Sequence, residues 1–138
     1  MASGLANRFK FNLFSKIIDL SSDTITVALM TNSHSFNADD DVWGDVSTNE
    51  ISGTGYSTPG ANLASLTVTQ DDANDKAVFD AANLSWAAAT FDAYHAVIYD
   101  NTVSGDPLIG SIDFGGIKSV VSGTFTINWS ASGIITLA

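Results

Sequence analysis

The residues of this sequence that are best suited to bind an ion are aspartates in two short stretches. The first holds Asp39, Asp40, Asp41 and Asp45, and the second runs from Asp71 to Asp75. Calcium takes oxygen ligands from such loops, but the first stretch lacks the glycine and the final glutamate of an EF-hand, and the second fits no better. Consecutive carboxylates repel one another unless water or a cation separates them. We therefore predict a solvated acidic loop for the first stretch and the polar turn of a hairpin for the second. Calcium binding is the alternative for both, and we expect folding to need no metal.

No arrangement of residues in the sequence predicts catalysis. The two histidines, His34 and His95, lie far apart in the chain, and His95 alternates with apolar neighbours as a core histidine does. The chain has no cysteine, its serines and threonines lie outside any nucleophile-elbow motif, and the run Gly53–Gly55 precedes no phosphate-binding helix. Glu50 could pair with an aspartate to hydrolyse glycosides, but the sequence gives no distance between them. We expect no catalytic residue, no cofactor and no enzymatic activity.

Three large aromatic residues could instead bind a ligand by stacking. Trp43, Tyr56 and Trp86 each combine an apolar ring with one hydrogen-bonding group, which suits contact with sugar rings. The first two lie in the stretch 42–63, whose glycine, proline, serine and asparagine residues predict an ordered loop that is neither a helix nor a plain strand. We interpret the stretch as a loop anchored on a sheet. A carbohydrate-binding or host-attachment module is the alternative, if these rings form an exposed row.

Positive charge is concentrated near the N-terminus. Arg8, Lys10 and Lys16 are three of the five cations in a chain whose formal net charge is −10. The spacing of the apolar residues predicts an amphipathic helix over residues 4–17, with Ser3 as its N-cap, that covers the open end of a β core. A strand is the structural alternative, and binding to a membrane surface is the functional alternative.

The rest of the chain predicts strands separated by turns. Runs rich in β-branched and aromatic residues alternate with short segments of glycine, asparagine, aspartate and serine. The predicted strands are 23–31, 66–70, 76–80, 84–86, 93–100, 108–114, 117–121, 124–129 and 133–137. Alternation in the eighth of these places Phe125, Ile127 and Trp129 inward. The small residues 87–89 leave room for another backbone to pass close by.

The pattern as a whole indicates one mainly β domain. We expect an antiparallel β-sandwich of about seven to nine strands over residues 1–138, with residues 1–20 as an N-terminal helix or arm. At 138 residues the chain is long enough to form its own core. Its negative charge opposes binding to nucleic acid, and no apolar run reaches the ~18 residues that would span a bilayer. The lack of cysteine fits synthesis in a reducing cytoplasm.

Several segments, in order along the chain, resemble one group of proteins. The central segment is Asn49–Tyr56, followed by Gly60 and Leu63. The flanking segments are Asn7–Lys10, Asp23–Leu29, Tyr94–Asp100 and Ser122–Leu137. Together they cover nearly the whole chain, and they resemble stretches of small structural proteins of tailed bacteriophages.

The resemblance implies a non-enzymatic virion protein that decorates and stabilises, or cements, the assembled capsid. The expected partner is the major capsid protein, and the expected location is the capsid surface, after synthesis in the host cytoplasm. A dimer or trimer is expected on the shell, with no nucleic acid or membrane as partner. Combined with the uneven charge, the resemblance makes Arg8, Phe9, Lys10 and Lys16 the candidate capsid contacts, because basic and apolar groups together suit an acidic shell.

Overall fold

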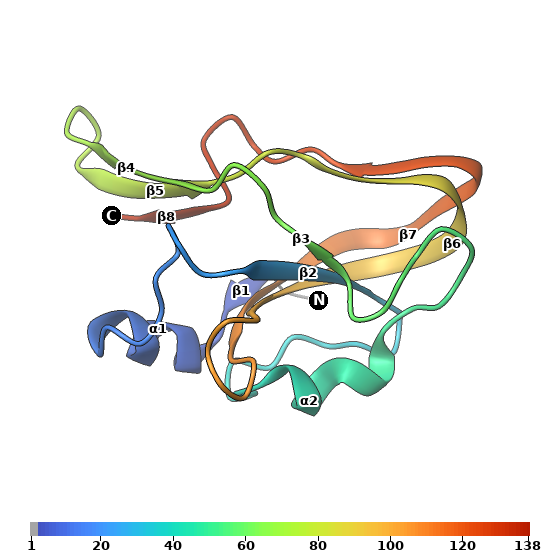
Figure 1. Cartoon of the computed structure of the whole chain (residues 1–138), viewed down its shortest axis with the longest axis horizontal. Helices are drawn as coiled ribbons and strands as arrows, with labels where there is room; N and C mark the ends of the chain where they lie inside the picture. The colour runs from blue at the N-terminus through green and yellow to red at the C-terminus, as the bar shows by residue number, and fades with distance from the viewer. Residues whose placement is uncertain (1–2) are drawn as a thin grey trace.

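The computed structural model describes residues 3–138 and shows a sandwich of two antiparallel β-sheets (Figure 1). The larger sheet has the strand order β1-β7-β6-β2-β3, and the smaller has the order β4-β5-β8. The strands are β1 Gly4–Leu5, β2 Ile25–Met30, β3 Ala61–Asn62, β4 Thr67–Asp71, β5 Lys76–Asp80, β6 Leu84–Asp100, β7 Leu108–Ile127 and β8 Ile135–Leu137. The helices are α1 Asn7–Phe14 and α2 Trp43–Val46, followed by a 3₁₀ turn, η1, at Ser47–Asn49. The mainly β fold and the number of strands agree with the prediction.

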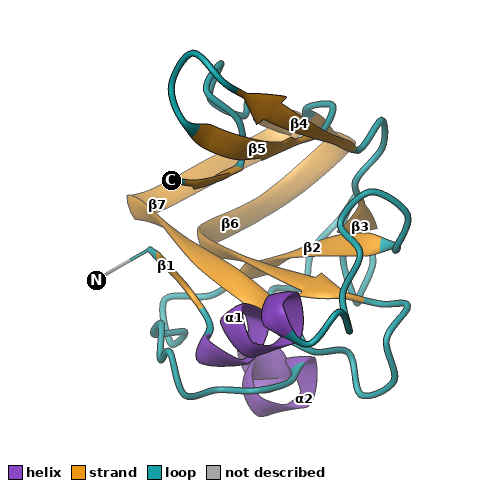
Figure 2. Ribbon diagram, turned by 90° about the vertical axis from the view of Figure 1, so that its left-hand side faces the viewer, coloured by secondary structure: helices purple, strands orange, loops and turns teal. Residues whose placement is uncertain are grey.

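The two helices lie on one side of the five-stranded sheet, and the three-stranded sheet lies on the other (Figure 1, Figure 2). β2 is buried along its whole length and pairs with the second half of β6, from Met30 opposite His95 to Ile25 opposite Asp100. Strands that are covered on both faces need apolar residues on both faces, so these two runs are almost continuously hydrophobic. The predicted central position of the strand at 93–100 is confirmed.

β6 and β7 form one long bent ribbon, which corrects the predicted division of residues 84–129 into five separate strands. In Figure 1 the ribbon runs back on itself, so that it contributes to both layers of the sandwich. Gly115 and Gly116 lie inside β7, where the register with β6 shifts, and Ser122 has a φ of 46° without ending the strand. Because β6 offers hydrogen-bonding partners on both sides of these residues, they bend the ladder instead of ending it.

α2 and η1 lie in the stretch 42–63, where the sequence predicts no helix. The carboxylate of Asp45 accepts hydrogen bonds from the backbone N–H groups of Asp41 and Val42, at 2.9 and 3.1 Å. These bonds satisfy backbone N–H groups at the start of the helix. The helix propensities of the individual residues do not reveal this stabilisation. The prediction that this stretch contains no helix is therefore wrong for residues 43–49.

The remainder of this stretch is anchored on the sheet, as predicted. The hydroxyl of Tyr56 accepts a hydrogen bond from the backbone N–H of Leu29 at 3.0 Å and donates one to the carboxylate of Glu50 at 2.5 Å. Gly55 has a φ of 82°, and a Cβ there would come within 2.8 Å of the Cα of Ala89. The small residues 87–89 therefore do allow another backbone to pass close by.

The N-terminal helix is shorter than the predicted range of 4–17. Gly4–Leu5 pairs with β7 as β1, and α1 begins only after Ala6. The Ser3 hydroxyl accepts a hydrogen bond from the backbone N–H of Asp113, at 2.9 Å, and does not cap the helix. Pairing with an open sheet edge satisfies the backbone of residues 4–5 in place of a first helical turn. Neither helix in the described chain is long and apolar enough to cross a membrane.

The predicted inward residues near the end of β7 lie against the core. Phe125 is buried, and Ile127 and Trp129 are partly buried against the same hydrophobic cluster. Trp129 follows the end of β7, and its indole N–H donates to the carbonyl of Ala82 at 3.1 Å. The inward assignment is confirmed fully for Phe125 and in part for the other two.

Candidate docking surface

Three large apolar side chains stand exposed at the C-terminal end of α1. Phe14 is 95% exposed, Phe11 is 56% exposed and Ile17 is 45% exposed. Phe11 and Phe14 are three residues apart, so they lie on the same side of the helix. Burying such side chains in a partner would be favourable by roughly 1.5–3 kcal/mol each. We call these three residues, together with Arg8, Lys10 and Lys16, the α1 face.

The α1 face carries positive charge on an otherwise acidic molecule. Residues 3–18 contain three cations and no carboxylate, so the rest of the chain has 15 acidic and 2 basic residues, or −13. The guanidinium of Arg8 lies 5.6 Å from the centre of the Phe11 ring and 3.2 Å from the carboxylate of Asp41. Lys10 lies within 3.5 Å of the side-chain oxygen of Asn7. Apolar rings are therefore flanked by cations.

The structure rules out Phe9 as one of the predicted capsid contacts. It is 1% exposed and packs in the core, because α1 covers the end of the sheet with this residue. Arg8, Lys10 and Lys16 remain at the surface or half-buried. The exposed rings are instead Phe11 and Phe14, which the sequence reasoning missed. The predicted apolar stripe of the helix consists of Leu5, Phe9, Leu13 or Phe14, and Ile17. Phe11 lies off this stripe, which was a signal for its exposure, whereas the exposure of Phe14 and Ile17 differs from the prediction.

A pocket of about 280 Å³ adjoins the α1 face. It is lined by Arg8, Asn12, Ile17, Asp41, Val42, Val103, Ser104 and Pro107. Asn12, which is only 3% exposed, is the most buried of the polar residues in this lining. The pocket thus combines apolar walls with the ion pair of Arg8 and Asp41.

The three aromatic residues considered for sugar stacking are buried. Trp43 and Tyr56 are each 9% exposed, and Trp86 is 6% exposed. Trp43 stacks on Tyr99, while Tyr56 and Trp86 belong to an aromatic cluster that includes Phe125. These rings are core residues, so the assignment of Trp43, Tyr56 and Trp86 as a sugar-binding row is wrong.

The two histidines, distant in sequence, lie together in the folded chain, with His95 in β6. Their ring centroids are 5.2 Å apart, the Nε2 of His34 is 2.9 Å from the hydroxyl of Ser111, and the Nδ1 of His95 is 3.9 Å from the carboxylate of Asp113. Burial, with His95 nearby, lowers the pKa of His34 to about 4. The Nδ1 of His95 is buried and has no hydrogen-bond partner among the described residues, so both rings are packed as buried side chains.

The aspartates considered for calcium are engaged by protein groups. Asp39 accepts from the amide of Asn7, Asp41 pairs with Arg8, and Asp45 caps α2. In the second stretch, the Asp71 carboxylate accepts from the side chain and the backbone of Asn74 within the turn between β4 and β5. Among residues 3–138 there is no group of three or more metal-binding side chains. The two stretches therefore show hydrogen-bonded turns, and metal-independent folding stays a prediction.

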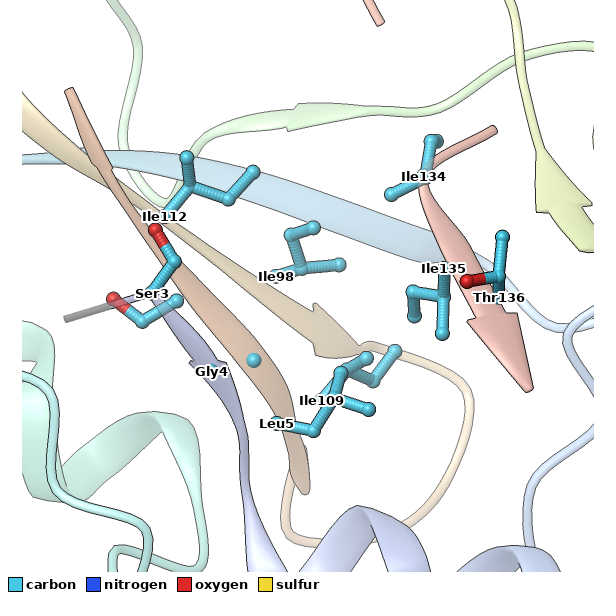
Figure 3. Close-up of a pocket in the computed structure, with 11 residues that line it drawn as sticks. Ser3, Gly4, Leu5, Ile98, Ile109, Ile112, Ile134, Ile135 and Thr136 are labelled. Carbon is cyan, nitrogen blue, oxygen red and sulfur yellow. The ribbon is translucent and has the colours of Figure 1, made fainter. Parts of the chain in front are cut away.

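An apolar groove lies between the open edges of the two sheets (Figure 3). Its volume is about 270 Å³, and β1, β7 and β8 contribute to its walls. The labelled side chains are mainly isoleucines, including Ile98, Ile112 and Ile135. None of the described residues that line this groove is charged, in contrast to the pocket beside α1.

A comparison of the chain with protein-family models, curated proteins and solved structures finds no match in any of the three. The candidate site must therefore be judged from its own geometry. On that basis the α1 face, with exposed rings, cations and an adjoining pocket, is the surface best equipped to bind another molecule.

Proposed function

We propose that this chain is a non-enzymatic structural protein of a tailed-phage virion, which decorates and stabilises the assembled capsid. Its α1 face would bind the major capsid protein. The observation that carries the proposal is the near-complete exposure of Phe14 beside Phe11, within the cationic part of an acidic molecule. The phage setting rests on the sequence resemblance described above.

The composition of the α1 face suits docking onto an acidic protein shell. Exposed apolar side chains supply the contact that becomes desolvated on binding, and surrounding cations steer the encounter and oppose wrong partners. Because the remainder of the chain is strongly negative, an acidic shell would be attracted to this face and repelled elsewhere. Binding in the proposed orientation should therefore weaken as salt concentration rises.

The remaining parts of the proposal concern assembly and location. The protein would be made in the host cytoplasm and would act at the capsid surface, as a dimer or trimer with copies repeated over the shell. Neither nucleic acid nor membrane is part of the proposed function. Repetition over a symmetric shell would let a small contact of modest affinity suffice.

The proposal is tested by co-sedimentation with capsids that lack this protein. Phe14→Ser and the double variant Lys10→Glu/Lys16→Glu should each weaken binding about tenfold or more, equivalent to roughly 1.4 kcal/mol. Arg8 is left in place because it pairs with Asp41. Val121→Ser is the matched control, since Val121 is 78% exposed in β7, away from α1, and this variant should bind as the unmodified protein does.

Three results would count against the proposal. If the unmodified protein does not sediment with the capsids, capsid decoration is wrong. If both α1 variants bind normally while Val121→Ser fails, another surface is responsible. Sedimentation with vesicles of phosphatidylserine and phosphatidylcholine, but not with capsids, would establish that the α1 face binds anionic lipid.

A further inference from the structure

We infer that the open edge of β8, with the apolar groove beside it, binds the same surface of a second copy of this chain and forms a twofold dimer. The two β8 strands pair antiparallel, so that the two three-stranded sheets join into one continuous sheet. This inference names the surface and the symmetry of the self-association in the proposed function, and it rests on that function in this respect alone. The residues of the α1 face do not line the groove, so docking on the capsid involves a different surface.

The two edges of the smaller sheet differ in charge. β8 pairs with β5 and with no other described strand, and its residues Ile135–Leu137 are uncharged. β4 lies at the opposite edge and ends at Asp71, in the acidic turn 71–75 (Figure 1). Charged side chains at an edge strand oppose pairing with another chain, whereas an apolar edge without them permits it. The sheet is therefore protected at β4 and open to pairing at β8.

The side chains of β8 place an exposed apolar group beside the groove. Ile135 and Leu137 lie on one face of the strand and Thr136 lies on the other, because side chains alternate along a strand. Figure 3 shows Ile135 on the side of β8 that faces Ile109 across the groove. Leu137 projects on this same side and is 62% exposed. A second copy at this edge covers Leu137 and closes the open side of the groove.

Antiparallel pairing of two β8 strands about a twofold axis is self-complementary. With the axis at Thr136, this residue lies opposite Thr136 of the second copy, and Ile135 of each copy lies opposite Leu137 of the other. Opposed threonines can hydrogen-bond across such a pair, and the isoleucine–leucine pairs remove apolar surface from water. Leu137 of each copy then reaches over the groove of the other, whose volume is about 270 Å³.

The distribution of charge selects a second copy as the occupant. None of the described residues that line the groove is charged, and Lys118 is the only charged side chain in residues 114–138. The other four basic and all 15 acidic residues lie in residues 1–113, which carry a formal charge of −11. Two copies that approach through acidic surfaces repel each other, whereas at the β8 edge they meet with little like charge. A partner chosen by its charge, in contrast, finds no opposite charge in this groove.

The first test is sedimentation equilibrium of the unmodified protein over a series of concentrations. We expect a monomer–dimer equilibrium, and Leu137→Ser should raise its dissociation constant about tenfold. Val121→Ser is the matched control, because it removes an apolar side chain that is 78% exposed but does not line the groove, and it should leave the equilibrium unchanged. The mass of a monomer at every concentration, or the mass of a trimer, would overturn the inference.

The twofold register is tested at Thr136. Thr136→Lys and Thr136→Glu each place two like charges opposite each other, so each variant alone should be monomeric where the unmodified protein is dimeric. An equimolar mixture of the two variants pairs opposite charges and should restore the mass of a dimer. Thr69→Lys, at an exposed position of the β4 edge, is the control and should remain dimeric. A dimer of either Thr136 variant alone, or no recovery in the mixture, would overturn the assigned edge.

Co-sedimentation with capsids that lack this protein separates the inference from the proposed function. Unmodified protein that is monomeric and still sediments with capsids would overturn the dimer and keep capsid docking. A dimer that does not sediment with capsids would keep the β8 interface and overturn capsid decoration. Recovery of the dimer in the mixture would also show that both Thr136 variants are folded, so their separate loss of dimerisation could be assigned to charge.

Discussion

Trp43 stacks face to face on Tyr99, with ring centroids 4.8 Å apart and ring planes 10° apart. Trp43 begins α2, and Tyr99 lies near the end of β6, so the stack joins the loop to the central strand. The Tyr99 hydroxyl donates to the carbonyl of Pro59 at 2.8 Å, within the same stretch of chain. One tyrosine thus holds both ends of the stretch 42–63 against the sheet.

This stack predicts that Trp43 contributes to stability and not to ligand binding. Trp43→Ala should lower the free energy of unfolding by about 3–5 kcal/mol, because it removes a large buried ring and leaves a cavity. Phe14→Ala is the control, since an exposed side chain away from special contacts should change stability by no more than about 0.5 kcal/mol. Urea unfolding followed by fluorescence and circular dichroism measures both. Equal stability of Trp43→Ala and the unmodified protein would show that the ring is not packed as described.

His34 predicts a loss of stability in mild acid. Its pKa is lowered from 6.5 to about 4 by burial and by His95, so between these values the unfolded chain binds a proton that the folded protein excludes. The contribution is therefore intact above pH 6.5 and is lost as pH falls toward 4, by about 1.4 kcal/mol per pH unit. His34→Gln, which can still bond to Ser111, should reduce this slope. Unfolding curves of both proteins near pH 7.5 and near pH 5 give the comparison, and identical slopes would contradict the assignment.

The raised pKa of Asp100 predicts the opposite dependence of stability on pH. Burial, with the Asp23 carboxyl acting in the same direction, raises its pKa from 3.8 to about 6, so the folded protein retains a proton that the unfolded chain releases. Stability is lost as pH rises from 3.8 to 6 and stays lowered above that range. Asp100→Asn should thus stabilise the protein near pH 8 by about 1–3 kcal/mol, and the gain should shrink near pH 4.

The geometry around Asp100 makes asparagine a suitable replacement. One carboxylate oxygen accepts from the backbone N–H groups of Thr102 and Val103, and an asparagine oxygen can keep both bonds. The other oxygen has no hydrogen-bond partner among the described residues. Asp92→Asn, on an exposed position of β6, is the control and should not alter stability at either pH. A destabilising effect of Asp100→Asn near pH 8 would contradict the prediction.

The conformation and the charge of Lys16 predict that one substitution there will raise stability and weaken docking. It ends α1 with a φ of 58°, where its N–H bonds the carbonyl of Leu13 and the N–H of Ile17 bonds the carbonyl of Asn12. Glycine is favoured at this helix-ending position, so Lys16→Gly should stabilise the fold by up to about 1 kcal/mol. It also removes a cation from the α1 face and should weaken capsid binding. Melting temperature and co-sedimentation should change in opposite directions, and stronger binding by Lys16→Gly would contradict the role of this cation.

Local patterns in the sequence determined much of the sandwich. The alternation and β-branched residues of β2, β4, β5 and the second half of β6 are properties of short segments, so these elements could be placed without knowing their neighbours. The small residues 87–89 and the glycines of the stretch 42–63 also carried readable information, since close backbone approach requires them. The uneven charge near α1 follows from the order of the residues in the sequence and needs no knowledge of the fold.

The tertiary structure decided what long-range pairing controls. In the sequence, Gly115 and Gly116 indicate a turn, but in the fold β6 pairs with β7 on both sides of them. Phe9 and Phe14 are the same residue type, and only the fold shows that Phe9 is buried and Phe14 is exposed. By its residue type, Trp43 could contact a sugar or pack in a core, and its stacking on Tyr99 shows that it packs in the core. The contact between His34 and His95 also exists only in the folded chain. Burial and contact depend on residues far away in the chain, because each apolar side chain is covered by whichever surface the fold brings to it.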